Sequence, residues 1–181
     1  MFMNNAVILI PSRLAATRLP KKPLLKINNI SIINHVYKIA NSSIVGQSYV
    51  ATGDKEIFDE VTKYGGKCIL TQSDHKTGTD RIFEAFQKLE NDNIEYVINL
   101  QGDEPMLDIQ DVNNLLEKTI EKKSKVSTLA CEIESEKILS KKNIVKVTTN
   151  EKLIEGKLST ATSFVREVSK TKQNIYHHIG I

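Results

Sequence analysis

The sequence predicts an α/β fold built on a doubly wound, mostly parallel sheet, and three observations lead to this prediction. The chain has 181 residues, of which 40% are apolar and 26% charged, the balance of a globular protein rather than a disordered one. Short, continuous apolar runs alternate along the chain with segments whose apolar residues recur at helical spacing. Short loops join the two kinds of segment, an order that builds parallel strands covered by helices on both faces.

Each apolar run fits a strand that is buried on both faces, as strands of a parallel sheet are. In chain order the predicted strands are Ala6–Ile10, Ser48–Thr52, Lys67–Thr71 and Tyr96–Leu100. The intervening helices are expected at Ile32–Ala40, Asp54–Tyr64, Thr79–Leu89 and Ile109–Ile120. The residues expected to cap the last three of these helices are Asp54, Thr79 and Asp108.

From Val126 onward the pattern is looser. Further strands are expected at Val126–Ile133, Ile144–Thr149 and Ile175–Ile181, separated by polar segments rich in lysine. Because the chain shows no internal repeat, low-complexity tract or linker, we expect one domain over residues 1–181.

Composition argues against several classes of protein. The apolar runs are far shorter than the ~20 residues of a membrane-spanning helix, and the N-terminus lacks the basic region and cleavage site of a signal peptide. Cys68 and Cys131 are far apart, without a CxxC motif, so we expect two buried thiols in a reducing cytoplasm. There is no HxxH, HExxH or Cys/His cluster, which argues against zinc.

Charge is unevenly distributed within a net value of +3. Residues 1–113 carry 12 basic and 14 acidic residues, whereas residues 114–181 carry 13 and 8. The basic excess comes from scattered lysines without interleaved aromatic residues, so a solvated helical surface is favoured over a nucleic-acid patch. These lysines include Lys122, Lys123, Lys141 and Lys142.

Three loops at the ends of predicted strands carry the candidate chemistry, because ligands of open α/β sheets bind beyond the carboxyl ends of the strands. The first, Pro11–Pro23, holds four cations that could bind phosphate, although an ordinary charged loop would look the same. The second, Asp74–Arg81, could hold a nucleoside or an anion at the start of a helix, or simply cap that helix. The third, Asn99–Pro105, places adjacent carboxylates where Mg²⁺ could bind, with a plain turn as the alternative.

The three loops, in this order and spacing, resemble those of the CMP-Kdo synthetases (3-deoxy-manno-octulosonate cytidylyltransferases). The segments are PSRLAATRLPKKPL, HKTGTDR and NLQGDEP, and the resemblance extends over essentially the whole chain. It implies a fold like that of nucleotide-diphospho-sugar transferases, CTP and Kdo as substrates, Mg²⁺, a cytoplasmic homodimer, and a role in lipopolysaccharide synthesis. The implied reaction transfers CMP from CTP to Kdo and releases pyrophosphate.

The resemblance also assigns roles to residues. Arg13, Arg18 and Lys22 match the family's triphosphate-binding loop, and Arg13, Lys22 and Asp103 are the implied catalytic residues, with Asp103 as the magnesium ligand. Two further residues match positions that bind the sugar: Gln101, which is also assigned to the nucleotide, and His178 of the HxGI segment. The nucleoside side is assigned to Thr77, Gly78 and Thr79.

The sequence departs from the family pattern in its last part. It ends at the HxGI segment, so we expect the chain to lack about 65 residues of a typical member, including the Glu-Gln-Leu and GVDTxxD segments. Ser159–Phe164 stands where the family has SRAxIP. We therefore expect little turnover from the 181 residues alone. The alternatives are a cytidylyltransferase for another acidic sugar such as sialic acid, a metal-dependent glycosyltransferase, or an inactive remnant that binds nucleotide or oligomerises.

Overall fold

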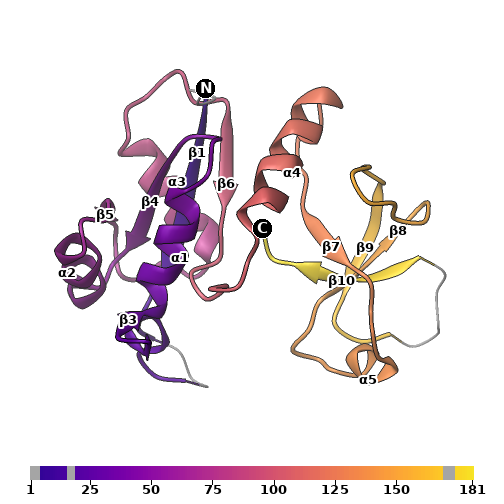
Figure 1. The fold of residues 1–181 in the computed structure, drawn as a ribbon, viewed down its shortest axis with the longest axis horizontal. Coiled ribbons are helices and arrows are strands. Elements are labelled where there is room, and N and C mark those ends of the chain that lie inside the picture. The colour runs from indigo at the N-terminus through magenta and orange to yellow at the C-terminus, as the bar shows by residue number, and fades with distance from the viewer. Residues whose placement is uncertain (1–4, 16–18, 169–173) are drawn as a thin grey trace. The chain divides into compact units, whose positions relative to one another are not determined.

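The computed structural model describes residues 5–15, 19–168 and 174–181, in two compact units formed by residues 1–113 and 114–181 (Figure 1). The boundary coincides with the change in the sign of the charge, from −2 in the first unit to +5 in the second. Each unit has its own sheet. The expectation of a single nucleotidyltransferase domain over residues 1–181 stays a prediction.

The first unit is built on a four-stranded parallel sheet with the order β5-β4-β1-β6. The chain starts near the centre of this sheet, extends it on one side through β4 and β5, and then returns to add β6 on the other side of β1. The topological switch point therefore lies between β1 and β6, where ligands of such sheets bind. The strands are β1 (Ala6–Ser12), β4 (Gln47–Thr52), β5 (Cys68–Leu70) and β6 (Tyr96–Asn99).

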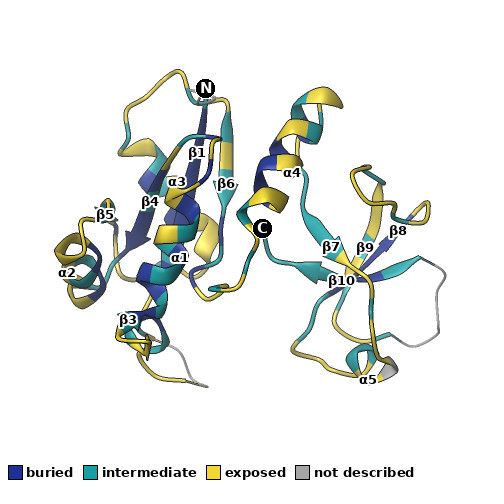
Figure 2. Ribbon diagram, viewed as in Figure 1, coloured by how far each residue is buried: buried dark blue, intermediate teal, exposed yellow. Residues whose placement is uncertain are grey.

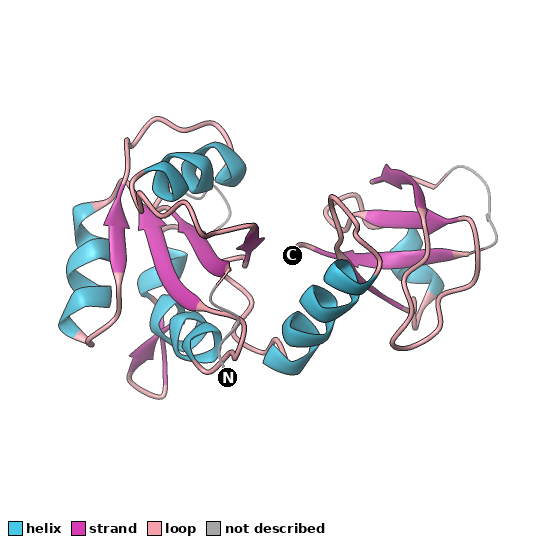
Figure 3. Cartoon of the chain, turned by 90° about the horizontal axis from the view of Figure 1, so that it is seen from above, coloured by secondary structure: helices cyan, strands magenta, loops and turns pink. Residues whose placement is uncertain are grey.

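Helices flank this sheet on both sides, which confirms the predicted α/β class (Figure 3). The central strand β1 is almost entirely buried (Figure 2). Its residues Val7 and Leu9 pack with Ile82 and Ala85 of α3, and the alternating residues between them face the opposite side of the sheet. These helices are α1 (Ile32–Asn41), α2 (Lys55–Lys63) and α3 (Gly78–Gln87). A fourth helix, α4 (Ile109–Glu121), spans the boundary between the two units.

Three short elements between β1 and α1 were not predicted. The 3₁₀ helix η1 (Lys22–Leu24) carries the buried Pro23, and β2 (Lys26–Ile27) pairs with β3 (Ile30–Ser31) in a small hairpin. Both residues of the hairpin turn have positive φ, as a tight two-residue turn requires. Such elements lack the apolar periodicity from which the longer ones are predicted.

The second unit holds an antiparallel sheet with the order β7-β10-β8-β9. Three of its strands lie within the predicted ranges. The fourth, β9, was not predicted because it is a largely exposed edge strand whose residues do not alternate between apolar and polar. The elements are β7 (Leu129–Cys131), α5 (Glu136–Leu139), β8 (Lys146–Thr149), β9 (Ala161–Val165) and β10 (Ile175–Ile179).

A buried lysine connects three segments of the second unit by hydrogen bonds. Lys146 is fully buried, and its Nζ donates to the carbonyl oxygens of Lys141 (2.7 Å) and Arg166 (2.8 Å). Burial lowers the pKa of this lysine, and the nearby charge of Arg166 acts in the same direction. Lys146 thereby ties β8 to the segment after α5 and to the end of β9.

Both cysteines are free thiols, but only part of the expectation for them holds. Cys68 is partly buried, and burial raises its pKa to about 12, so it is an unreactive thiol. The prediction of a buried Cys131 was wrong. This residue is exposed because β7 is an edge strand. Within the described parts of the chain, no helix has both the length and the apolar character needed to cross a membrane.

Candidate functional site

The three loops singled out from the sequence meet at the end of β1, and Pro11 is their common point. A Cβ at Gly78 would lie 3.2 Å from the Pro11 ring, and a Cβ at Gly102 would lie 2.9 Å from the Pro11 carbonyl oxygen. The second distance is too short for any side chain, so glycine is required for the loop after β6 to pass this close to β1. The segments HKTGTDR and NLQGDEP are thus both packed against the start of the first loop, Pro11–Pro23, which we call the cationic loop.

Two contacts, one near each end of the cationic loop, hold it against the start of α2. The Leu14 N–H donates to Asp54 Oδ2 (2.8 Å), and Lys21 Nζ pairs with Glu56 Oε2 (2.8 Å). Asp54 does occupy the predicted N-cap position of α2, but its carboxylate holds the loop and makes no capping hydrogen bond. Arg13 is exposed at the start of the loop. The predicted phosphate ligand Arg18 lies outside the described residues.

An ion pair joins the cationic loop to the third loop, Asn99–Pro105, which we call the acidic loop. Lys22 Nζ lies 2.6 Å from Asp103 Oδ2, and the two side chains are 35% and 51% exposed. Because such an exposed pair contributes at most ~1 kcal/mol, ligands can separate it at little cost. A phosphate could then take the ammonium group while a cation takes the carboxylate, and both groups already lie at the switch point of the sheet.

The loop before α3 is capped differently from the prediction. The predicted N-cap Thr79 was wrong: the N-cap is Thr77, and the helix begins at Gly78. Thr77 Oγ1 accepts from Asp80 N (3.1 Å) and donates to Asp80 Oδ2, which also accepts from Thr77 N. This capping box explains the shift, because only Thr77 has an acidic residue three positions later. It engages the Thr77 hydroxyl and leaves the first backbone N–H groups of α3 as the donors there.

Two residues of α3 that the sequence analysis did not single out hold this loop in place. Arg81 is 3% exposed and donates to Thr71 Oγ1 (2.5 Å), the Gln72 carbonyl (2.8 Å) and the Ser73 carbonyl (3.3 Å). Glu84 accepts from the Gln72 N–H (3.0 Å) and from Lys88 (2.7 Å), and it also contacts His75. The sequence did contain a signal for Arg81: helical periodicity places this arginine next to the apolar face of the helix, where a charged side chain needs hydrogen-bond partners.

The two predicted sugar ligands lie in different units. Gln101 is partly buried in the loop after β6, where its Nε2 donates to Asn99 Oδ1 (3.1 Å). His178 lies in β10, the strand expected from the sequence, and its ring contacts Phe164 edge-on at 5.0 Å between centroids. Burial lowers the His178 pKa, and the charge of His177 adds to this, so the ring is neutral at pH 7.

Comparison with known proteins identifies the family. The profile of the family described as cytidylyltransferase matches residues 7–181. The chain belongs to the cytidylyltransferase family. It is 38% identical to a 3-deoxy-manno-octulosonate cytidylyltransferase of Rhodopseudomonas palustris (strain BisB18), over 98% of this chain and 73% of that protein. Identity to the enzyme of the same name from Nitrobacter winogradskyi is 37%, over 98% of this chain and 70% of that protein.

A solved structure agrees with these sequence matches. It is described as CMP:2-keto-3-deoxy-manno-octonic acid synthetase complexed with CTP. It superposes on this cytidylyltransferase with a TM-score of 0.85 and 36% sequence identity, covering 98% of this chain and 72% of the other. The match confirms the nucleotidyltransferase fold that the sequence resemblance implied.

The donor set of this cytidylyltransferase fits a magnesium ion bound together with phosphate. Among the described residues no three His, Cys, Asp or Glu side chains converge, so no all-protein metal cage is formed there. Mg²⁺ instead favours one or two carboxylates, with phosphate and water oxygens completing its octahedron. Asp103, exposed and opposite the cationic loop, supplies a carboxylate of this kind.

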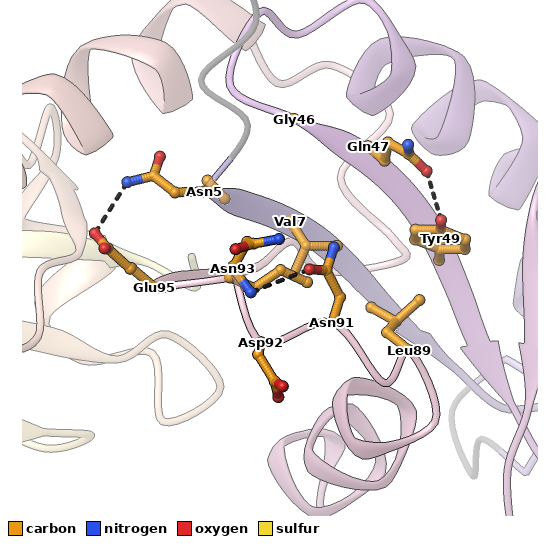
Figure 4. Close-up of a pocket in the computed structure, with 12 residues that line it drawn as sticks. Asn5, Val7, Gly46, Gln47, Tyr49, Leu89, Asn91, Asp92, Asn93 and Glu95 are labelled. Carbon is orange, nitrogen blue, oxygen red and sulfur yellow. Dashed lines mark hydrogen bonds between the residues drawn. The ribbon is translucent and has the colours of Figure 1, made fainter.

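A wide hollow of about 1070 Å³ lies at the opposite, amino edge of the same sheet (Figure 4). Polar side chains around it are bonded to one another: Asn5 to Glu95 (3.0 Å), and Tyr49 to Gln47 (2.5 Å). Ligands of open α/β sheets bind at the carboxyl edge, where the cationic and acidic loops also lie. We therefore assign the candidate site of this cytidylyltransferase to the carboxyl edge.

Proposed function

We propose that this chain transfers CMP from CTP to Kdo and releases pyrophosphate. The observation that carries the proposal is the Lys22–Asp103 contact, which brings a phosphate-binding cation and a metal-binding carboxylate together at the switch point of the sheet. Support also comes from relatives named for this activity and from the similar structure complexed with CTP.

In the proposed reaction a Kdo hydroxyl oxygen attacks the α-phosphorus of CTP. The new O–P bond forms as the bond from the α-phosphorus to the bridging oxygen of the β-phosphate breaks, and that oxygen leaves with pyrophosphate. The hydroxyl proton passes to solvent. Because no covalent enzyme intermediate is needed, the chain's own residues act by positioning the reactants and neutralising charge.

Each group in the site has a part in this scheme. Lys22 and Arg13 hold the triphosphate, and Arg18 is proposed to do the same. Gly78 and Thr79 offer backbone N–H groups to the nucleotide at the start of α3. Asp103 would hold Mg²⁺, which supplies positive charge to the triphosphate when bound. Three residues remain assigned by the resemblance: Thr77 and Gln101 to the nucleotide, and Gln101 and His178 to the sugar.

Calorimetry and a turnover assay test this function. We expect CTP with Mg²⁺ to bind at least tenfold more tightly than ATP or GTP, and pyrophosphate to be released with Kdo but not with sialic acid. Equal binding of the three nucleotides would contradict a cytidylyltransferase site. Turnover with sialic acid alone would reassign the sugar, and cleavage of a sugar nucleotide without pyrophosphate would indicate a glycosyltransferase.

The setting of the reaction is part of the same proposal. A Kdo-activating enzyme belongs to lipopolysaccharide synthesis, and CTP as a substrate places it in the cytoplasm, where the free thiols of Cys68 and Cys131 would remain reduced. We expect a homodimer when the C-terminal part of a typical family member is present. Light scattering of a chain that includes this part tests the assembly, and a monomeric mass would reject it.

A further inference from the structure

Side chains on one face of the antiparallel sheet hold the ring of His178 in position. Cross-strand pairing places His178 opposite Ala130 of β7. Thr128 precedes Ala130 by two residues and so approaches the same face. Its Oγ1 lies 2.9 Å from His178 Nε2. On the other side of the ring, Phe164 of β9 contacts it edge-on with an interplanar angle of 81°. The ring is therefore held between an aromatic edge and a hydroxyl.

The hydrogen bonds of Thr128 decide which ring nitrogen carries the proton. Thr128 Oγ1 also lies 2.7 Å from the Ile181 carbonyl oxygen and 3.2 Å from the Ile179 carbonyl oxygen. A threonine hydroxyl has a single proton, and carbonyl oxygens can only accept. The proton of Thr128 is therefore committed to the backbone, so the oxygen must accept a hydrogen bond from the imidazole. His178 Nε2 must then be the protonated nitrogen.

This protonation leaves a defined group for a ligand. A neutral imidazole with a proton on Nε2 keeps a lone pair on Nδ1. Among the described residues, His178 Nδ1 has no hydrogen-bond partner. Burial and the neighbouring His177 both disfavour the charged ring, which agrees with a neutral acceptor. An acceptor suits the hydroxyl groups of a sugar and does not suit a carboxylate.

We propose that Thr128 is a positioning residue that fixes His178 as the Nε2–H tautomer, so that Nδ1 accepts a hydrogen bond from a hydroxyl of the sugar substrate. The part of this inference that concerns the sugar rests on the proposed function. The part that concerns the tautomer does not, because it follows from contacts within the second unit alone.

Nitrogen-15 NMR of the full chain tests the tautomer directly. At about pH 7.5 we expect the His178 Nε2 to show the shift of a protonated nitrogen and its proton to exchange slowly. His35 is an internal reference, because its Nε2 lies 2.9 Å from the Ile27 carbonyl oxygen and must also carry the proton. A proton on His178 Nδ1 would overturn the proposal without the need for any variant.

Variants extend the test to binding. In Thr128→Val the slow Nε2 proton should disappear into fast exchange, and the KM for Kdo should rise about tenfold while the KM for CTP stays within twofold. Thr128→Ser should restore both values. Thr149→Val is the matched control, since Thr149 lies in the same sheet and its hydroxyl donates to the Glu151 carbonyl (2.6 Å). An unchanged His178 proton in Thr128→Val would reject the coupling.

The two measurements separate the possible failures. If the tautomer responds to Thr128→Val but the KM for Kdo does not, the assignment of His178 to the sugar is wrong. If neither CTP nor Kdo binds, the proposed function fails, and the NMR result still decides the role of Thr128.

Discussion

Two of the three loops that meet at Pro11 use positive charge in opposite ways. The loop after β1 presents Lys22, which is one-third exposed and pairs with a half-exposed carboxylate, Asp103. The loop after β5 is held by Arg81, which is 3% exposed and donates to three neutral oxygens of that loop. The first cation can exchange its partner for a ligand. The second is buried and holds the backbone of Gln72 and Ser73 in place.

The difference shows that burial, rather than charge, separates binding residues from scaffold residues at this edge of the sheet. When the Lys22–Asp103 ion pair separates, water solvates both charged groups, so the separation costs little free energy. Arg81 and its partner Thr71 are 3% and 6% exposed and have little of this compensation, because buried polar groups left without hydrogen bonds cost ~1–3 kcal/mol each. Substitutions should therefore affect stability on one loop and affinity on the other.

The largest effect is expected from Arg81→Met. It leaves the Thr71 hydroxyl and the carbonyl oxygens of Gln72 and Ser73 without their donor, so the free energy of unfolding should fall by about 3 kcal/mol. Urea denaturation followed by circular dichroism measures this. Arg13→Ala, which removes an exposed cation from the neighbouring loop, is the control and should change stability by less than ~0.5 kcal/mol. Equal losses of unfolding free energy in Arg81→Met and Arg13→Ala would show that burial does not separate scaffold residues from binding residues here.

Asp103→Asn should have the next largest effect, on affinity instead of stability. Losing the carboxylate should weaken Mg²⁺-dependent CTP binding about 100-fold, or ~2.7 kcal/mol, with the unfolding midpoint nearly unchanged. Calorimetry with and without Mg²⁺ measures the change. Glu95→Gln, at the amino edge of the sheet, should bind CTP as the unmodified chain does. If magnesium dependence survived in Asp103→Asn, this residue would be only part of a turn.

Lys22→Ala should reduce CTP affinity about tenfold while cytidine affinity stays within twofold, because the ammonium contacts phosphate and not the nucleoside. Stability should change by less than ~0.5 kcal/mol. Lys21→Ala is a closely matched control, because the adjacent lysine pairs with Glu56 and not with the acidic loop. A similar loss of CTP affinity in both variants would indicate general attraction by the loop instead of a contact made by Lys22.

The smallest effect concerns pH. Burial would raise the pKa of Glu84, but hydrogen bonds from Lys88, His75 and the Gln72 N–H outweigh it and hold the pKa at about 2. A carboxylate with a lowered pKa contributes stability that is present above about pH 4.5 and lost as the pH falls towards 2. The contribution should be about 1 kcal/mol.

Denaturation between pH 6 and pH 2, compared between the unmodified chain and Glu84→Gln, measures this contribution. The two curves should converge in acid. Glu121→Gln is the control, because Glu121 also has a lowered pKa, caused first by its hydrogen bond from Lys118, but lies at the surface. Its curve should follow the unmodified one. Parallel curves for the unmodified chain and Glu84→Gln would show that Glu84 does not hold the loop.

The candidate site was predictable to the extent that strand order fixes where loops meet. The ends of β1, β5 and β6 were expected at one edge, and Pro11, Gly78 and Gly102 do bring their loops together there. The prediction did not extend to Arg81, because its importance depends on oxygens of Thr71, Gln72 and Ser73 that come within hydrogen-bond distance of the guanidinium only on folding. Thr128 was missed for the same reason: its partner His178 is 50 residues away in the chain.

The sequence by itself determined the parallel sheet, its flanking helices and the family, because apolar periodicity and the three motifs are local properties of the chain. Tertiary structure alone decided which cation of the first loop meets Asp103 and which nitrogen of His178 carries a proton. It also decided that β9 is a strand. Each of these depends on hydrogen bonds between distant segments, and their geometry exists only once the backbone has brought donors and acceptors within about 3 Å of each other.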